Sequence, residues 1–342
     1  MNSRNKLAEM PIRPLLYTMA VPLMLSLLVQ SLYNIVDSIF VARLSETALT
    51  AASLVYSIQF LMIAVGVGTA VGLNALLSRK IGEHKPEEAC RAATTGLFLM
   101  IFTSLIFSMI GIFLSDTIAT KLAADSELQE LCKQYLSINL VYCWGIFLQT
   151  YAQRLLQAVG DTVLSMLSLI IGAGLNIILD PLFIFGFGLE TNGAAYATWI
   201  SQATVFSIFI YQLRFRKDSL LGGFPFFTQL KKRYTRRILK LGLPVATLNT
   251  LFAFVNMFLC RTASEQGGHI GLMTFTTGGQ IEAITWNTSQ GFSTALSAFI
   301  AQNYAAGRTE RVLKAWYTTL WMTGIFGTFC TLLFIFFGNE VF

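Results

Sequence analysis

An aspartate within an apolar run is the first residue whose chemistry needs explaining. Asp37 lies in the run 14–42, in the segment QSLYNIVDSIFVARL. A helix of about 20 apolar residues crosses a bilayer, and an aspartate near its centre costs roughly 2.5–3.5 kcal/mol on insertion. Gln30 and Tyr33 precede Asp37 by seven and four residues, so the three side chains share one helix face. The Asp37 carboxyl therefore needs polar partners, a bound cation or a proton.

A second polar group follows in the segment LNIILDPL. Asn176 and Asp180 stand four residues apart on one face of a predicted helix, and Thr198 lies six residues into the next. At 1.5 Å per residue, Asp37, Asp180 and Thr198 lie at a similar depth, roughly 8–13 Å from the outer edge. We predict that they converge in one cluster. Its oxygens suit either a proton relay or a hard cation such as Na⁺.

Two prolines accompany these residues. Pro22 and Pro181 cannot donate a backbone N–H, so the carbonyls of Thr18 and Ile177 lose their helical partners. We expect Pro22 and Pro181 to give their helices a place to bend. The Ile177 carbonyl would add an oxygen beside the two carboxyls.

Further polar residues occur in TTGGQIEAITWNTSQG. Gln280 and Glu282 fall at membrane depth there and are expected to face a central cavity, unless the segment is an outer loop. Other interpretations of the polar residues stay open. An intramembrane aspartate can serve as a structural hydrogen-bond acceptor, and plain packing accounts equally well for Tyr33 and Thr198.

Composition identifies the class of protein. Hydrophobic residues make up 54% of the 342, charged residues 12%, and the mean hydropathy is +0.62. A soluble domain carries about twice that charge, and helix-length apolar runs exclude an outer-membrane barrel. The chain is therefore predicted to be an all-α polytopic membrane protein. Its five scattered cysteines suggest neither disulfides nor a metal site, and no cofactor is expected.

Nine spanning segments are predicted. They are 14–42, 51–77, 93–114, 131–153, 163–187, 192–213, 238–262, 270–302 and 313–338. If successive loops lie on alternating sides of the membrane, 20 of the 24 Lys and Arg residues fall on one side. The excess of positive charge predicts a cytoplasmic N-terminus in the cell membrane. It is explained by loops that face anionic membrane lipid, without nucleic acid.

A repeat divides the chain. The segment GTAVGLNALLSRKIGEHKPEEACRA (68–92) returns as GFSTALSAFIAQNYAAGRTERVLKA (291–315), a register of 223 residues. Six helices precede the second copy, so the copies are parallel, as in many transporters. We expect an N-terminal lobe at 1–213, a basic cytoplasmic linker at 214–237 and the first three helices of a C-terminal lobe at 238–342. The complete plan would have two six-helix lobes, with three helices absent from this chain.

The sequence resembles the multidrug and toxic compound extrusion (MATE) family, DinF-like prokaryotic branch. The resemblance rests on QSLYNIVDSIFVARL, GTAVGLNALLSRKIGE, LLQAVGD and GLNIILDPLFIFGFGLETNGAAYATWISQ, and continues in GFSTALSAFIAQNYAAGR. It implies an antiporter, not an enzyme, that exports cationic amphiphilic compounds in exchange for H⁺ or Na⁺ and works as a monomer.

The resemblance also implies residue roles. Asp37 resembles the family's first-helix coupling carboxylate, and Pro22 its bend. Asn176, Asp180 and Thr198 resemble the rest of the first-lobe ion site, with Gln30 and Tyr33 beside it. PVATLNTLFAFVNMF, early in the seventh helix, lacks the glutamate of members that have a second-lobe cation site. We therefore expect coupling through the first lobe.

Two rival functions are less consistent with the sequence. A flippase for lipid-linked sugars shares the two-lobed plan but would need cationic side chains in its cavity, and no Lys or Arg lies within a predicted helix core. An intramembrane aspartyl protease would use two aspartates. The Tyr-Asp and Gly-x-Gly-Asp contexts expected there are missing, because Asp37 follows Val36 and Asp180 follows Leu179.

Overall fold

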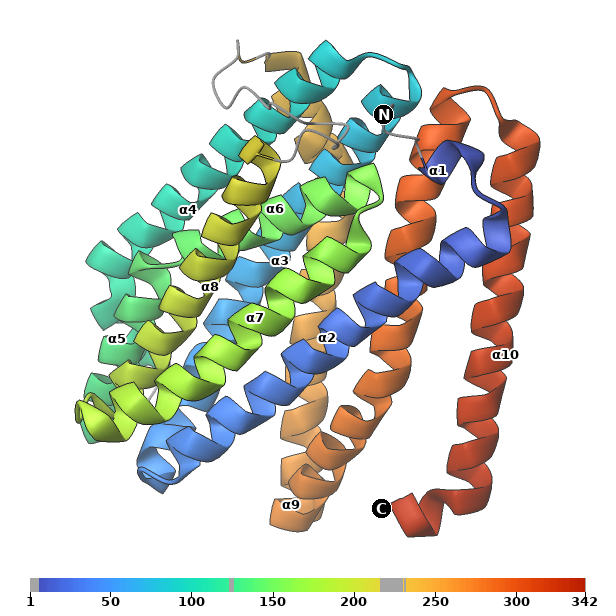
Figure 1. The fold of residues 1–342 in the computed structure, drawn as a ribbon. Helices are drawn as coiled ribbons and strands as arrows, with labels where there is room; N and C mark the ends of the chain where they lie inside the picture. Colours follow the sequence, from blue (N-terminus) through green and yellow to red (C-terminus); the bar gives the residue numbers. More distant parts are fainter. Residues whose placement is uncertain (1–5, 123–125, 216–229, 231, 342) are drawn as a thin grey trace.

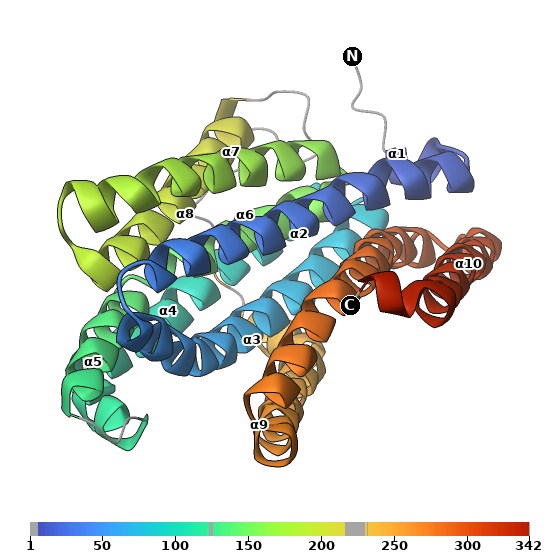
Figure 2. The ribbon, with the colours of Figure 1, turned by 90° about the horizontal axis from the view of Figure 1, so that it is seen from below.

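The protein is a bundle of long helices. The computed structural model describes residues 6–122, 126–215, 230 and 232–341, and these contain helices and no strand. The helices are α1 (Lys6–Glu9), α2 (Ile12–Ala42), α3 (Glu46–Gly82), α4 (Pro86–Leu122), α5 (Ser126–Val141), α6 (Trp144–Val159), α7 (Thr162–Pro181), the π-helix η1 (Leu182–Gly186), α8 (Glu190–Phe215), α9 (Lys232–Ala305) and α10 (Thr309–Val341). Helices α2 to α8 form one group, and α9 and α10 lie at its side (Figures 1 and 2). The predicted all-α polytopic class is confirmed.

Local sequence signals set several helix ends. Ser45 caps α3, because its hydroxyl accepts a hydrogen bond from the Ala48 N–H at 3.0 Å. Asp161 caps α7 through the Leu164 N–H at 3.4 Å. Gly160 ends α6 with φ of 84°, a left-handed conformation that glycine adopts without strain.

Six of the helical stretches among the described residues are long and apolar enough to cross a membrane. They are 12–41, 50–82, 86–122, 162–186, 232–260 and 309–336. The other three predicted spans, 131–153, 192–213 and 270–302, are helical wholly or in most of their length. That these three also cross the membrane stays a prediction.

The predicted single helix at 131–153 is wrong, because the chain turns at Tyr142 and Cys143, between α5 and α6. The turn leaves backbone carbonyls without helical partners, and neighbouring groups bond there. Ser108 on α4 donates its hydroxyl to the Val141 carbonyl at 2.8 Å. The predicted helix at 163–187 also differs, since it ends at Pro181 and continues as the π-helix η1.

The helix α9 contains two of the predicted spans, 238–262 and 270–302. Figure 1 shows that a first limb of α9 runs down the bundle and a second limb runs back up next to it. A Cβ built on Gly271 would lie 2.6 Å from the Ala263 carbonyl oxygen, eight residues earlier, so the chain doubles back between them. The helical assignment is continuous through the reversal. The residues between the two predicted spans, 263–269, are therefore part of the helix and not a gap, although two antiparallel limbs are present.

The repeat predicted from the 223-residue register recurs as matching backbone hydrogen bonds. The Lys85 N–H donates to the Lys80 carbonyl at 3.1 Å, and the Arg308 N–H donates to the Asn303 carbonyl at 2.9 Å. The turn residue of each copy has positive φ, 55° at His84 and 75° at Gly307. The two α-helix–turn–α-helix units therefore share one backbone geometry.

The two halves of the chain approach closely through equivalent glycines. A Cβ on Gly68 would lie 2.6 Å from the Ala246 Cβ, and a Cβ on Gly291 would lie 2.5 Å from the Met24 Cγ. Gly68 and Gly291 are 223 residues apart, so α3 packs on α9 as α9 packs on α2. The lobe boundaries 1–213 and 238–342 stay a prediction. The 214–237 linker lies largely outside the described residues.

Candidate functional site

The polar residues of α7 and α8 meet in one hydrogen-bonded cluster. The Asn176 amide donates to the Asp180 carboxyl at 3.1 Å and lies 3.3 Å from the Thr198 hydroxyl. Asn176 and Asp180 are buried, because they lie on the α7 face that packs in the bundle. This arrangement matches the predicted pairing of the three residues.

The α2 residues complete the cluster from the other side. Gln30 and Tyr33 are joined by a side-chain hydrogen bond, and the Asp37 carboxyl lies within electrostatic range of the Tyr33 hydroxyl. The Asp37 and Asp180 carboxyls also interact electrostatically with each other. Helices α2 and α7 pack along each other, as Figure 2 shows from below. The structure thus brings Asn176, Asp180 and Thr198 into contact, with Asp37 on the neighbouring helix α2 within electrostatic range of Asp180; the full predicted site stays a prediction.

A carbonyl of α2 that Pro22 leaves without a helical donor is hydrogen-bonded by α7. Pro22 lies inside α2, so the Thr18 carbonyl has no N–H partner one turn later. The Thr162 hydroxyl at the start of α7 donates to that carbonyl at 3.4 Å. The contact joins the two helices that carry the carboxyls. A role for Pro181 in freeing the Ile177 carbonyl stays a prediction.

Three buried oxygens in the cluster lack a hydrogen-bond donor. Within the described part of the chain, Asp37 Oδ1, Asn176 Oδ1 and Asp180 Oδ2 have no partner. Buried polar atoms are normally hydrogen-bonded, and each exception calls for an explanation. Three acceptors without donors suit a proton or a cation.

A small polar cavity adjoins the cluster. It measures about 30 Å³, and Gln30, Tyr33, Asn176 and Thr198 are among its lining residues. One water needs roughly 10–15 Å³ of such space. The cavity also reaches Ser201, whose buried hydroxyl has no partner among the described residues. The cavity thus has room for about two water molecules beside Asn176 and Thr198.

Sequence reasoning missed the contribution of α5. The Tyr135 hydroxyl lies within electrostatic range of both Asp37 and Asp180, and Tyr135 hydrogen-bonds the Asn139 side chain. The Gln59 amide of α3 donates to Asn139 in turn. Tyr135 and Asn139 are four residues apart in an apolar segment, the same spacing signal that pointed to Asn176 and Asp180.

Other predicted residues lie elsewhere. Glu282 is an exposed residue of α9, so its segment is helical and not an outer loop. Its position in a central cavity stays a prediction, and the Gln280 side chain lies outside the described residues. Two cations lie just beyond the predicted helix cores 51–77 and 131–153. Arg154 belongs to α6, only partly exposed, and Lys80 is buried near the end of α3.

The ligand chemistry of the cluster favours light, hard cations. Within the ranges that the structure describes, no group of three or more His, Cys, Asp or Glu side chains is placed to bind a metal ion. Two carboxyls, an amide and a hydroxyl form an all-oxygen set. Such ligands suit hard cations and give no thiolate or imidazole for a transition metal.

Comparisons with known proteins identify relatives over most of the chain. The MatE family model matches residues 22–182 and 244–342. The chain is 25% identical to the FAD transporter of Shewanella oneidensis over 100% of its own length and 76% of that protein. It is 25% identical to the multidrug export protein MepA of Staphylococcus aureus over 86% of its length, and it spans 66% of MepA.

A solved structure gives the same fold. The chain matches an outward-facing multidrug resistance MATE family transporter of the MOP superfamily with a TM-score of 0.92 and 24% identity. The match covers 100% of this chain and 76% of that structure. The likeness establishes the fold, and the site described above lies within the matched region.

Proposed function

The chain belongs to the MatE family of multi-pass membrane transporters, and on that premise we propose that it exports cationic amphiphilic compounds in exchange for H⁺ or Na⁺. The relatives named above are transporters and not enzymes. The exchange, the ion and the exported compound are inferred from the site.

The observation that carries the proposal is the set of three buried acceptors without donors at Asp37, Asn176 and Asp180. Two carboxyls in a poorly solvated site cannot both ionise cheaply, so one holds a proton or both share a cation. Loading and releasing that ion changes the charge of the site by one unit. A site of this kind can respond to an ion gradient.

Coupling follows if the ion binds the two conformations of the protein with different affinity. An ion taken up at Asp37 and Asp180 then shifts the population towards the conformation that holds it more tightly. The compound must prefer one conformation as well, and the two preferences together give exchange. The hydrogen bond from Thr162 to the Thr18 carbonyl joins α2 to α7 close to Pro22, where we expect α2 to bend. A change at the site can then be transmitted along α2.

The chemistry of the site favours cationic compounds over anionic ones. Acidic groups beside the cavity attract positive charge, whereas an anion such as FAD requires cationic or amide donors. The relative from Shewanella oneidensis is named a FAD transporter, so both classes belong in the test. Arg154 is the cation in α6 that such an anion would need to reach.

The proposal also covers the orientation of the protein in the membrane, its oligomeric state and its contacts with lipid. We place the N-terminus in the cytoplasm, from the asymmetry of Lys and Arg. We expect the protein to act as a monomer, with its exposed apolar helix faces against lipid. These statements rest on the sequence and on the membrane class of the family.

The experiment measures export of a fluorescent cationic dye and of FAD by cells that express the full chain, under imposed pH or Na⁺ gradients. Asp37→Asn and Asp180→Asn should each abolish gradient-driven dye export while dye binding persists. The double variant should be no worse than the worse single variant, because the pair acts as one unit. Asp116→Asn is the matched control, since Asp116 is an exposed carboxylate paired with Lys133 at 2.8 Å.

Full dye export by Asp37→Asn would refute the ion-coupling role and leave this aspartate a structural acceptor. Additive losses in the double variant would refute the shared site. Export of FAD without export of the dye would overturn the proposed substrate class.

A further inference from the structure

The start of the chain is held by residues from the second half. The Asn303 amide of α9 donates to the Leu7 carbonyl at 3.0 Å. The Arg311 guanidinium of α10 donates to the Met10 carbonyl, and Arg308, in the turn before α10, donates to the Ala8 carbonyl at 2.7 Å. We call these contacts to the backbone of residues 7–10 the N-terminal latch. They join positions about 300 residues apart in the sequence.

The N-terminal latch is buried at Leu7 and Asn303, whereas Arg311 is half-buried and Arg308 is exposed. Leu7 and Asn303 are at most 1% exposed. The Arg311 guanidinium lies 5.3 Å from the centre of the Phe299 ring, a cation–π contact. Leu7 and Phe299 belong to one apolar cluster that also contains Ala298 and Leu15. The latch therefore closes over an apolar interface between the two halves.

A second latch stands at the equivalent positions of the first copy. Residues 80 and 88 correspond to 303 and 311 in the 223-residue register. Lys80 lies 2.5 Å from Glu88, and Glu88 hydrogen-bonds Tyr234 at the start of α9. Tyr234 corresponds to Pro11, next to the segment held by the N-terminal latch. We call this set the α9 latch.

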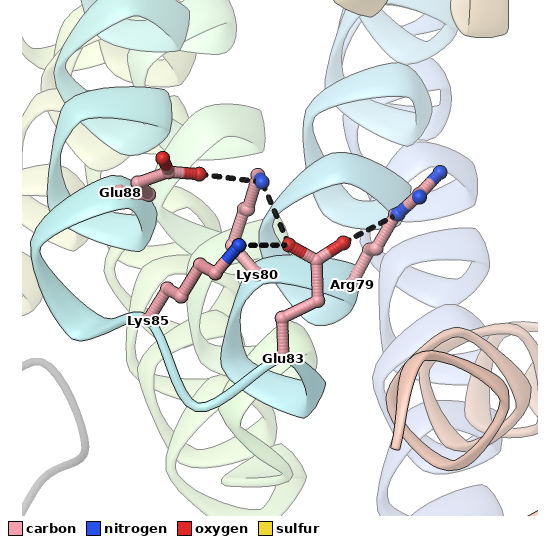
Figure 3. Close-up of polar contacts among 5 residues, drawn as sticks. All are labelled: Arg79, Lys80, Glu83, Lys85 and Glu88. Atoms are coloured by element: carbon pink, nitrogen blue, oxygen red, sulfur yellow. Dashed lines mark hydrogen bonds and ion pairs between the residues drawn. The ribbon is translucent and has the colours of Figure 1, made fainter. Parts of the chain in front are cut away.

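The α9 latch is braced by a charge network. Figure 3 shows Lys80 between Glu83 and Glu88, with Arg79 and Lys85 also directed to Glu83. Beside Lys80 and Arg79, the pKa of Glu83 falls from 4.5 to about 2. Glu83 therefore stays charged and holds Lys80 towards Glu88. We call the end of the bundle where α2 starts the N-terminal face. The start of α2 lies there beside α9 and α10, and α2 then leans away from α10 (Figure 1). Both latches lie on this face.

We propose that the two latches hold the halves together on the N-terminal face, with Asn303 and Arg311 as positioning residues that must release for this face to open. This inference rests on the proposed function, because alternating access requires the halves to part there. Each latch binds the start of the first helix of the other half: the N-terminal latch contacts residues 7–10 before α2, and the α9 latch contacts Tyr234 at the start of α9. Their release would free α2 and the first limb of α9 to swing.

The test measures opening directly. Ala298 is fully buried in the interface between the halves. A cysteine placed there, in the full chain with its five native cysteines replaced, reports opening by its rate of reaction with a water-soluble maleimide. Arg311→Ala should raise that rate roughly tenfold, as expected when a hydrogen bond to a charged group is lost. Arg311→Lys should raise it less.

Matched controls separate the latch from a general loss of charge. Lys314→Ala removes an exposed cation one turn later on α10 and should leave the rate unchanged. In the α9 latch, Glu88→Gln should raise the rate and its exposed neighbour Glu87→Gln should not. If Arg311→Ala fails to fold, the exposed Arg308→Ala against its neighbour Thr309→Ala decides between the same outcomes.

The labelling reaction needs neither the coupling ion nor the exported compound. Its result therefore tests the latches independently of the proposed function. An unchanged rate in folded Arg311→Ala, in a protein that exports dye, overturns the latch alone. A raised rate in a protein that exports nothing supports the latch and overturns the proposed function. A rise in Lys314→Ala equal to that in Arg311→Ala overturns the latch as well.

Discussion

The contact of α3 with α9 predicts a large cost for one added methyl group. A Cβ on Gly72 would lie 2.1 Å from the Ile238 carbonyl oxygen and 2.9 Å from the Gly242 nitrogen. Because these are backbone atoms, no side-chain rotation relieves the overlap. The helices must separate by roughly 1 Å to reach van der Waals distance. Overpacking of this kind costs about 1–3 kcal/mol, and occasionally more.

Gly174 provides the matched control on α7. Nothing lies within 4 Å of a Cβ built there, so Gly174→Ala should stabilise its helix by up to about 1 kcal/mol. We expect Gly72→Ala to lower the apparent melting temperature in detergent and Gly174→Ala to keep or raise it. The assay is the monodisperse fraction that survives heating, measured by size-exclusion chromatography. Equal melting of the two variants would refute the close approach of α3 and α9.

Three further predictions follow from individual contacts. Folding lowers the Glu83 pKa from 4.5 to about 2, so its stabilising effect is complete above pH 4.5 and is lost as the pH falls towards 2. Glu83→Gln should thus lower the melting temperature at pH 7. Below pH 4.5, the melting temperature of this variant should decrease less with falling pH than that of the wild type. The same decrease in both proteins would contradict this prediction. Thr162→Val leaves the Thr18 carbonyl without its donor and should cost about 1–3 kcal/mol, measured by the same heating assay; Pro22→Ala, which restores an N–H to that carbonyl, should reduce the cost. A cysteine at position 230 should react with a membrane-impermeant thiol reagent only after cells are permeabilised, and labelling of intact cells would reverse the predicted orientation.

The cluster was predictable because its signals are local. Asn176 and Asp180 are four residues apart, and that spacing fixes a shared face in any helix. The meeting of Asp37 with them followed from depth, since helix rise converts sequence distance into height. Depth does not specify which helix stands next to which. The pairing of α2 with α7 required the structure.

The missed residues show where such reasoning ends. Tyr135 has the same spacing signal with Asn139, yet the segment was interpreted as one straight span, 131–153. The turn at Tyr142 and Cys143 depends on tertiary bonds such as Ser108 to the Val141 carbonyl, which a single sequence does not reveal. The reversal in α9 was anticipated by the separate spans 238–262 and 270–302, but the helical state of the residues between them was not. A polar stretch with glycines predicted a loop, and helical bonding continues through it.

The repeat explains why the two latches differ in chemistry and agree in position. Backbone geometry recurs at the 223-residue register, from Gly68 and Gly291 to the turns at His84 and Gly307. Side chains at equivalent places differ, with Glu88 in the first copy and Arg311 in the second, and their partners differ as well. Glu88 bonds a tyrosine hydroxyl, whereas Arg311 bonds backbone carbonyls. A duplicated backbone therefore retains the place where the halves meet, while each half sets the strength of its own contact through one side chain.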